Sequence, residues 1–201
     1  AKAGASLLFW PTVDWPLALG TLWLLLLIGA VATLASVSQL AFIIALVRNA
    51  IRDPLTGAFS RQGGSELLAL QFNQSVRNGT PLAVAFIDLD EFKRINDEHG
   101  HEAGDRALAE AVQQMTRQLR TGDILARWGG EEFVIIMPNT AAAKAAVGLE
   151  RTRAAGFGQR PEGGPLTACI GIAERSADQV DAWSMLVDLA DARMYEAKQS
   201  G

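Results

Sequence analysis

The feature that most constrains this chain is a long run without charge near its start. Residues 17–47, 31 in all, contain no Asp, Glu, Lys or Arg. A helix of that length reaches about 46 Å, whereas the hydrocarbon core of a bilayer is about 30 Å thick. The run therefore predicts one membrane-spanning helix with a helical extension. It is too short for two spans, too long for the apolar part of a signal peptide, and no clear small-residue cleavage site follows it.

Basic residues flank this run unequally. Lys2 is the only basic residue before it, whereas Arg48 and Arg52 follow it at once. Because positively charged flanks stay in the cytoplasm, we expect an inner (cytoplasmic) membrane protein whose C-terminal part faces the cytoplasm. Trp10 and Trp15 would suit the interface between this membrane and water on its outer side, where aromatic residues are enriched. The chain begins without a methionine, and we expect it to be a fragment that lacks an upstream portion such as a sensor.

We divide the chain into three parts on this pattern. Residues 1–16 are expected to be an extracytoplasmic flank, residues 17–50 a transmembrane helix with a short coiled-coil stalk, and residues 51–201 a globular domain. The stalk rests on apolar residues at spacings of four, three and four, namely Leu40, Ile44, Val47 and Ile51. This seam is too short to pair alone, although a membrane span could hold two copies together. A helix that rests on its own domain explains the spacing equally well.

Composition restricts the function of the domain. The chain has 201 residues, 49% hydrophobic, which is enough apolar mass for one sizeable core besides the uncharged run. Its net charge of −4 and the lack of a basic stripe argue against nucleic-acid binding. A single cysteine, Cys169, excludes an internal disulfide and a multi-cysteine metal site, and its apolar neighbours predict a buried position.

Helical and strand-like patterns alternate after residue 51. We expect helices over 63–78, 107–119, 141–153 and 182–198, and strands over 81–88, 123–128, 132–137 and 166–173. Residues 91–105 and 156–165 are expected to be loops. Gly129 and Gly130 are expected to supply the positive φ of a two-residue hairpin turn. This order predicts an α/β domain, in the α+β sense, with a central mixed sheet covered by helices.

Two carboxylates distant in sequence are candidates for a metal site. Asp88 ends the buried strand "PLAVAFID", at the edge where ligands bind open sheets. If the hairpin strands pair beside this strand, the Gly-Gly turn presents Glu131 next to Asp88. Two such carboxylates repel unless a divalent cation lies between them, and Mg²⁺ prefers hard oxygen ligands. This pattern indicates metal-dependent phosphoryl transfer, whereas "DLD" read alone favours a helix cap.

The segment after Asp88 offers contacts for a nucleotide. Backbone N–H groups around residues 91–93 can surround phosphate oxygens, with Lys93 adding a mobile charge. Asn96 and Asp105 match the edge of guanine. The carboxylate can accept hydrogen bonds from the N–H groups of the base, and the amide can donate one to the carbonyl of the base. His99 and His101 have no third metal ligand nearby and are interpreted as loop residues.

Four segments carry a family resemblance. "DPLTGAFSR", "FIDLDEFKRINDEHGHEAGD", "RWGGEEF" and "YEAK" resemble, in order, the signature segments of the GGDEF family, the diguanylate cyclases. The resemblance implies a palm-like nucleotide-cyclase fold that condenses two GTP into cyclic di-GMP and two pyrophosphates. Ala58 and Ser60 depart from the usual Leu and Asn, and GGEEF replaces GGDEF while keeping the carboxylate. The chain stops at Gly201, before a basic residue that the family often carries.

The resemblance implies roles for the matching residues. Asp88, Glu131 and the Leu89 carbonyl would bind Mg²⁺, two ions per active site, with Mn²⁺ as an alternative. Glu131 would also help to deprotonate the attacking 3′-hydroxyl, with Glu132 in support. The substrate contacts that it implies are Phe92, Lys93, Asn96, Asp105, Leu108 and Lys198.

A second constellation lies at Arg120-Thr121-Gly122-Asp123. It fits the RxxD pattern that forms an inhibitory product site in this family, with Arg151 as an expected secondary contact. RxxD is a common pattern that also fits a solvated helix end. The implied partners are GTP, cyclic di-GMP as product and inhibitor, a second copy in a two-fold homodimer, and the membrane through residues 17–47.

Two other functions remain open. The domain could be a catalytically silent module that senses GTP or cyclic di-GMP, or a membrane scaffold that only dimerises. A silent module is expected to have lost the metal carboxylates, whereas Asp88, Glu131 and Glu132 are all present. The intact guanine and phosphate positions argue against the scaffold.

Overall fold

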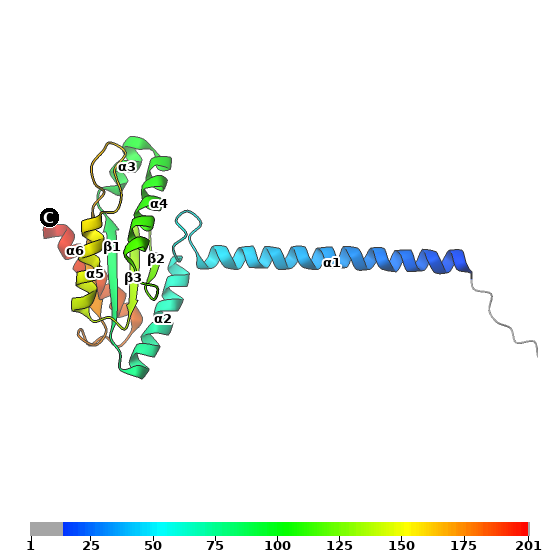
Figure 1. Ribbon diagram of the computed structural model, residues 1–201, viewed down its shortest axis with the longest axis horizontal. Helices are drawn as coiled ribbons and strands as arrows, with labels where there is room; N and C mark the ends of the chain where they lie inside the picture. Colours follow the sequence, from blue (N-terminus) through cyan, green and yellow to red (C-terminus); the bar gives the residue numbers. More distant parts are fainter. Residues whose placement is uncertain (1–13, 201) are drawn as a thin grey trace, which may run out of the picture. The chain divides into compact units, whose positions relative to one another are not determined.

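The computed structural model describes residues 14–200, except for the side chains of residues 44–50 (Figure 1). The chain divides into two compact units, Ala1–Leu46 and Val47–Gly201. Lys2, Trp10 and most of the expected N-terminal flank lie outside the described residues.

Helix α1 (Trp15–Ile51) contains the uncharged run. Its segment Trp15–Ile43 has a mean hydropathy of 2.3, and no residue in its most apolar window is buried. At about 44 Å this segment is long enough to cross a bilayer. The match is one of length and composition, which a signal sequence near an N-terminus also meets. The side chains of Ile44 and Val47 lie outside the described part, so the coiled-coil seam stays a prediction.

The domain is built on four strands. These are β1 (Leu82–Leu89), β2 (Ile124–Arg127), β3 (Glu132–Pro138) and β4 (Ala168–Glu174), in the spatial order β2-β3-β1-β4. All three strand pairs are antiparallel, although a mixed sheet was expected. The reason is that β3 lies between β1 and β2, which run in the same direction. A parallel contact occurs only as an isolated bridge between Phe59 and Ala126 in the described chain.

Helices cover both faces of this sheet, which confirms the expected α/β fold class (Figure 1). Helices α3 (Phe92–His99), α4 (His101–Gln118) and α5 (Ala142–Ala155) pack on one face. Helices α2 (Arg61–Asn78) and α6 (Trp183–Ser200) pack on the other. Alternate residues of β1 enter the two cores, Ala85 and Ile87 one and Val84 and Phe86 the other. All eight residues of β1 are therefore buried.

The prediction of a loop over residues 91–105 is wrong, because this segment forms α3 and the start of α4. His99 ends the first helix and His101 begins the second. Gly100 separates them with φ 79° and ψ 164°, a conformation open essentially to glycine alone. Helix α3 has only eight residues and buries only Phe92 and Ile95. Two apolar positions are too few to show helical periodicity in the sequence.

The close packing of α6 on β4 gives a test of the fold. A Cβ atom added at Gly171 would lie 2.0 Å from the carbonyl oxygen of Ala190 and 2.2 Å from the amide nitrogen of Met194. Because both are backbone atoms, Gly171→Ala must push α6 away from the sheet. We expect the free energy of unfolding to fall by about 2 kcal/mol or more.

The matched control is Gly148→Ala on α5, where the nearest atom outside the helix backbone is 3.9 Å away. That change is expected to be neutral or to stabilise by up to about 1 kcal/mol. Thermal unfolding of the detergent-solubilised chain, followed by circular dichroism, compares the two variants. Equal melting temperatures would contradict the packing described for Gly171.

Candidate active site at the end of strand β1

Asp88 lies near the C-terminal end of β1, in the middle of the sheet. It is paired with Glu132 on β3 and with Cys169 on β4. Strand alternation places its side chain on the α6 face, where the residue is 8% exposed. A carboxylate this buried needs a partner, and Lys198 Nζ of α6 lies 2.6 Å from its Oδ1. This hydrogen bond raises the pKa of Lys198.

Glu131 and Glu132 reach Asp88 from the connection between β2 and β3. The amide of Leu89 donates to the carbonyl of Glu131 over 3.2 Å, which fixes this connection against the end of β1. Burial, followed by the charge of Asp88, raises the pKa of both glutamates, and the charge of Lys198 partly offsets the rise. The structure thus brings Asp88, Glu131 and Glu132 together as a cluster with excess negative charge.

The glycines before these glutamates do not have the predicted geometry. Neither Gly129 nor Gly130 has a positive φ, and the connection runs from Arg127 to Glu132 rather than through a two-residue turn. The absence of a side chain at Gly129 matters for space rather than for backbone conformation. A Cβ there would lie 2.0 Å from Oε2 of Glu132, so the glycine leaves space for that carboxylate to fold over the connection.

Arg127 holds this connection in place, a role that the sequence analysis missed. Its Nε donates to the Gly129 carbonyl over 3.2 Å and its Nη2 to the Gly130 carbonyl over 2.8 Å. Its Nη1 lies 3.2 Å from both carboxylate oxygens of Asp53. Burial by itself raises the pKa of Asp53, but hydrogen bonds from Thr56 and the charge of Arg127 outweigh it and lower the pKa overall. The position of Arg127 directly before "WGGEE" was the available signal.

The donor set fits a magnesium ion that also carries phosphate. The described residues contain no group of three or more His, Cys, Asp and Glu side chains that could hold a metal alone. Mg²⁺, however, is usually held by one or two carboxylates together with waters and substrate phosphates. Asp88 and Glu131 are two such carboxylates beside the Leu89 backbone. Burial is the main cause of the raised pKa of Glu131 and Glu132, and the charge of Asp88, which adds to the rise, also favours a cation there.

The turn after β1 has the geometry of an anion site. Glu91 adopts φ 56° and ψ 22°, and α3 begins at the next residue. A left-handed residue followed by helical ones points successive N–H groups in one direction. The amides of Arg94 and Ile95 donate to the Glu91 carbonyl. Among the residues that the structure describes, those of Phe92 and Lys93 donate to no backbone carbonyl in a turn or loop. We call these two amides and the exposed Lys93 side chain the phosphate cradle. The Phe92 ring is buried, so Phe92 offers only its backbone.

The two residues expected to bind guanine lie on adjoining helices. Asn96 belongs to α3 and the exposed Asp105 to the second turn of α4. A Cβ at Gly104 would lie 2.0 Å from Asn96 Oδ1, so the glycine lets this amide lie against α4 beside Asp105. Leu108 is 2% exposed and lies in the core rather than on the surface.

Cys169 lies at the edge of the site and is half-buried rather than in the core. Its Sγ is 3.2 Å from Asp90 Oδ1. Burial and this hydrogen bond raise the pKa of the thiol to about 11. The thiol is therefore neutral near pH 7 and poorly suited to act as a nucleophile.

The residues of the expected product site meet in another region, after α4. The Arg120 amide donates to Asp123 Oδ2 and the Asp123 amide to the Arg120 carbonyl, both over 3.0 Å. The Arg120 side chain is exposed. These two residues border a groove of about 980 Å³ and, together with Arg151, a smaller pocket.

Known proteins resemble the domain closely. Residues 50–201 match the family model described as diguanylate cyclase, GGDEF domain. The chain is 37% identical over 157 residues to diguanylate cyclase DgcP of Pseudomonas aeruginosa, which covers 77% of this chain and 23% of that protein. It is 35% identical over 163 residues to response regulator PleD of Caulobacter vibrioides, covering 76% of this chain and 35% of PleD. The chain thus spans about a quarter to a third of these curated relatives.

A solved structure shares the fold. The coiled coil and GGDEF domain of DgcB from Caulobacter crescentus, solved in complex with c-di-GMP, superposes with a TM-score of 0.75. It is 28% identical and covers 88% of this chain and 95% of that chain.

The raised pKa of Glu131 predicts how stability depends on pH. Because its pKa is higher in the folded chain than the reference value of 4.5, the folded state binds more protons, and stability is lost as the pH rises through the folded pKa. Glu131→Gln removes this loss. In EDTA we expect the wild-type chain and the variant to have equal melting temperatures at about pH 4. At about pH 7 the variant should melt about 1–3 °C higher, a small gain because the group is partly solvated. A less stable variant at the higher pH would rule out the crowding of carboxylates.

Proposed function

The chain belongs to the diguanylate cyclase GGDEF domain family, and we propose on that premise that residues 51–201 condense two GTP into cyclic di-GMP and two pyrophosphates. The observation that carries the proposal is the meeting of Asp88 and Glu131 at the end of β1. The phosphate cradle begins only four residues after Asp88. The carboxylates and the cradle therefore suit one bound nucleotide.

Metal binding is assigned to Asp88, Glu131 and the Leu89 carbonyl, with two Mg²⁺ per site or Mn²⁺ in their place. A metal held there would supply Lewis acidity, which would favour loss of the proton from the 3′-hydroxyl, and positive charge to offset that of the phosphates. Glu131 is also assigned to help deprotonate the attacking hydroxyl, because a carboxylate beside the metal is placed to accept its proton. Glu132, folded over Gly129, adds negative charge beside it. Lys198 is assigned to the triphosphate, and its flexible stem lets it serve phosphate as well as Asp88.

Substrate recognition is assigned to α3 and the start of α4. The cradle of Phe92 and Lys93 amides binds phosphate oxygens. Asn96 and Asp105 bind guanine, with Leu108 supporting them from the core. Adenine lacks the paired N–H donors that Asp105 would accept, so the site is proposed to prefer GTP to ATP.

Catalysis is proposed to need a homodimer. Each domain holds one GTP, so two domains must face each other for each 3′-hydroxyl to reach the other α-phosphate. Residues 17–50, as a membrane span with a stalk, would raise the effective concentration of the two domains and control their orientation. In this arrangement the domain lies in the cytoplasm at the inner membrane, and residues 1–16 lie outside. The similarity of DgcB, solved with its coiled coil, supports this proposal.

The activity is tested with Glu131→Gln, which removes a proposed metal ligand while keeping the size of the side chain. We expect the rate of cyclic di-GMP formation from GTP and Mg²⁺ to fall by about a hundredfold or more, with an unchanged circular dichroism spectrum. Glu66→Gln, on the exposed face of α2, is the matched control and should keep full activity. Chromatographic separation of the products measures both rates.

Two outcomes would contradict this assignment. Near-normal turnover by Glu131→Gln would remove Glu131 from the metal site. A wild-type chain that dimerises and binds GTP without forming cyclic di-GMP would identify a silent sensing module instead.

Product inhibition is proposed at Arg120 and Asp123, with Arg151 as a secondary contact. A guanidinium binds guanine or phosphate through two parallel hydrogen bonds. Arg120→Ala is therefore expected to raise the inhibition constant of cyclic di-GMP by about tenfold or more without changing the initial rate. Arg117→Ala, at the exposed C-terminal end of α4 and lining the same groove, is the control. An unchanged inhibition constant in Arg120→Ala would exclude this regulatory site.

A further inference from the structure

Glu91 has an unusual backbone conformation at an important position. It is a residue other than glycine with φ 56°, and it immediately precedes the helix that carries the phosphate cradle. Glutamate is less stable than glycine in this left-handed region, because its Cβ atom crowds the backbone. Its side chain makes no capping hydrogen bond to α3. Contacts from outside the turn must therefore stabilise this conformation.

Arg160, in the loop between α5 and β4, provides such a contact. Its Nη1 lies 2.5 Å from Glu91 Oε2, and Nη1 of Arg94 lies 3.2 Å from the same oxygen. The Arg160 side chain is 18% exposed, whereas those of Glu91 and Arg94 are 51% exposed. Arg160 therefore approaches Glu91 from the protein side. Its Nε is buried and has no hydrogen-bond partner among the described residues, which costs stability rather than adding it.

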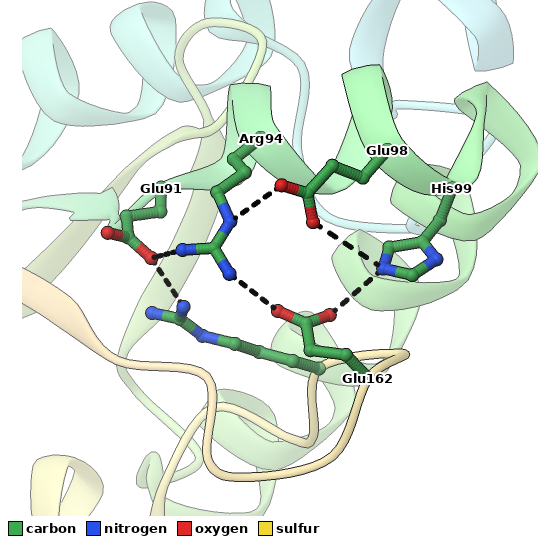
Figure 2. Close-up of polar contacts among 6 residues, drawn as sticks. Glu91, Arg94, Glu98, His99 and Glu162 are labelled. Atoms are coloured by element: carbon green, nitrogen blue, oxygen red, sulfur yellow. Dashed lines mark hydrogen bonds and ion pairs between the residues drawn. The ribbon is translucent and has the colours of Figure 1, made fainter.

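The same loop contacts the far end of α3. Figure 2 shows Arg94 between Glu91, Glu98 and Glu162, with His99 directed at both Glu98 and Glu162. The His99 Nε2 atom lies 3.2 Å from Glu162 Oε2. The loop thus holds α3 near both ends, through Arg160 at the start and Glu162 at the end.

The loop is itself well fixed, so it can act as a support. Phe157 and Leu166, near its two ends, are each 1% exposed. The Arg160 amide donates to the Gly164 carbonyl over 2.9 Å. The Asp90 amide, directly before Glu91, donates to the Thr167 carbonyl over 2.9 Å. The position of Arg160 relative to the end of β1 is therefore defined by backbone contacts.

We infer that Arg160 is a positioning residue for the phosphates of the nucleotide. It holds Glu91 in the left-handed conformation that directs the Phe92 and Lys93 amides toward one anion. It also neutralises the Glu91 carboxylate, which would otherwise repel phosphate at the adjoining cradle. That the anion belongs to GTP rests on the proposed function. The backbone conformation of the cradle is seen in the structure and does not depend on that function.

Stability and binding separate this role from a structural one. Because Glu91 is half-exposed, its ion pair with Arg160 adds little to the free energy of unfolding, and the buried Nε of Arg160 opposes folding. Arg160→Ala is therefore expected to leave the melting temperature nearly unchanged. It should instead weaken anion binding, because Glu91 loses the contact from the protein side that favours its strained conformation.

The test measures binding of inorganic pyrophosphate to the full chain in detergent micelles with Mg²⁺, by calorimetry. Arg160→Ala is expected to raise the Kd by about fivefold or more, and Arg160→Lys should recover most of the affinity because it keeps the charge. Arg153→Ala is the matched control. It also removes one arginine, which pairs with Glu150 on the exposed face of α5, and should leave the Kd unchanged.

A second background tests whether Arg160 acts through Glu91. Glycine adopts the left-handed conformation freely and has no carboxylate to neutralise. In a Glu91→Gly chain, Arg160→Ala should change the Kd by less than about twofold. An equal loss in both backgrounds, or equal affinities for Arg160→Ala and Arg153→Ala, would overturn the inference.

Turnover distinguishes this inference from the proposed function. With GTP, Arg160→Ala should raise KM while kcat stays within about twofold of the wild-type value. If the expected pyrophosphate results appear without any cyclic di-GMP, the proposed function fails and the role of Arg160 holds. If cyclic di-GMP forms but Arg160→Ala binds pyrophosphate as the wild type does, only the role of Arg160 fails.

Discussion

The site depends first on the contact between Arg127 and Asp53. The connection that carries Glu131 and Glu132 has no regular structure of its own, and Arg127 fixes it through two backbone carbonyls and one carboxylate. Both side chains of the ion pair are less than a fifth exposed, so salt screens the pair less than a surface contact. With the Leu89–Glu131 hydrogen bond, this pair determines where the glutamates lie relative to Asp88.

Two glycines share one function in this arrangement. Gly129 leaves space for the Glu132 carboxylate and Gly104 for the Asn96 amide, each at the place where a Cβ would be 2.0 Å away. In both cases an absent side chain on one residue makes room for the polar end of another. The carboxylate cluster and the proposed guanine contact therefore both include a glycine that leaves space for a neighbouring polar group. Conformational freedom, the usual reason for glycine, does not explain either position, since neither has a positive φ.

The sequence could predict the strands and the meeting of Asp88 with Glu131, because a buried strand ending in a carboxylate and a Gly-Gly-Glu-Glu segment are strong local patterns. It could not predict α3, which is too short for a visible periodicity. It also could not predict the antiparallel sheet, because this depends on β3 pairing between β1 and β2, and such pairing joins segments distant in sequence. The partners of Arg127 and Arg160 were equally hidden, because each contact joins residues about 70 positions apart and leaves no periodic signal.

The position of Asp53 links the glutamates to the start of the domain. Helix α1 ends at Ile51, two residues before the carboxylate that Arg127 grips. Arg127 joins that carboxylate to the Gly129 and Gly130 carbonyls, so the placement of the glutamates depends on a residue at the very start of the domain. In the folded domain, the end of α1 and the two acidic side chains are therefore separated by one short turn and a single guanidinium.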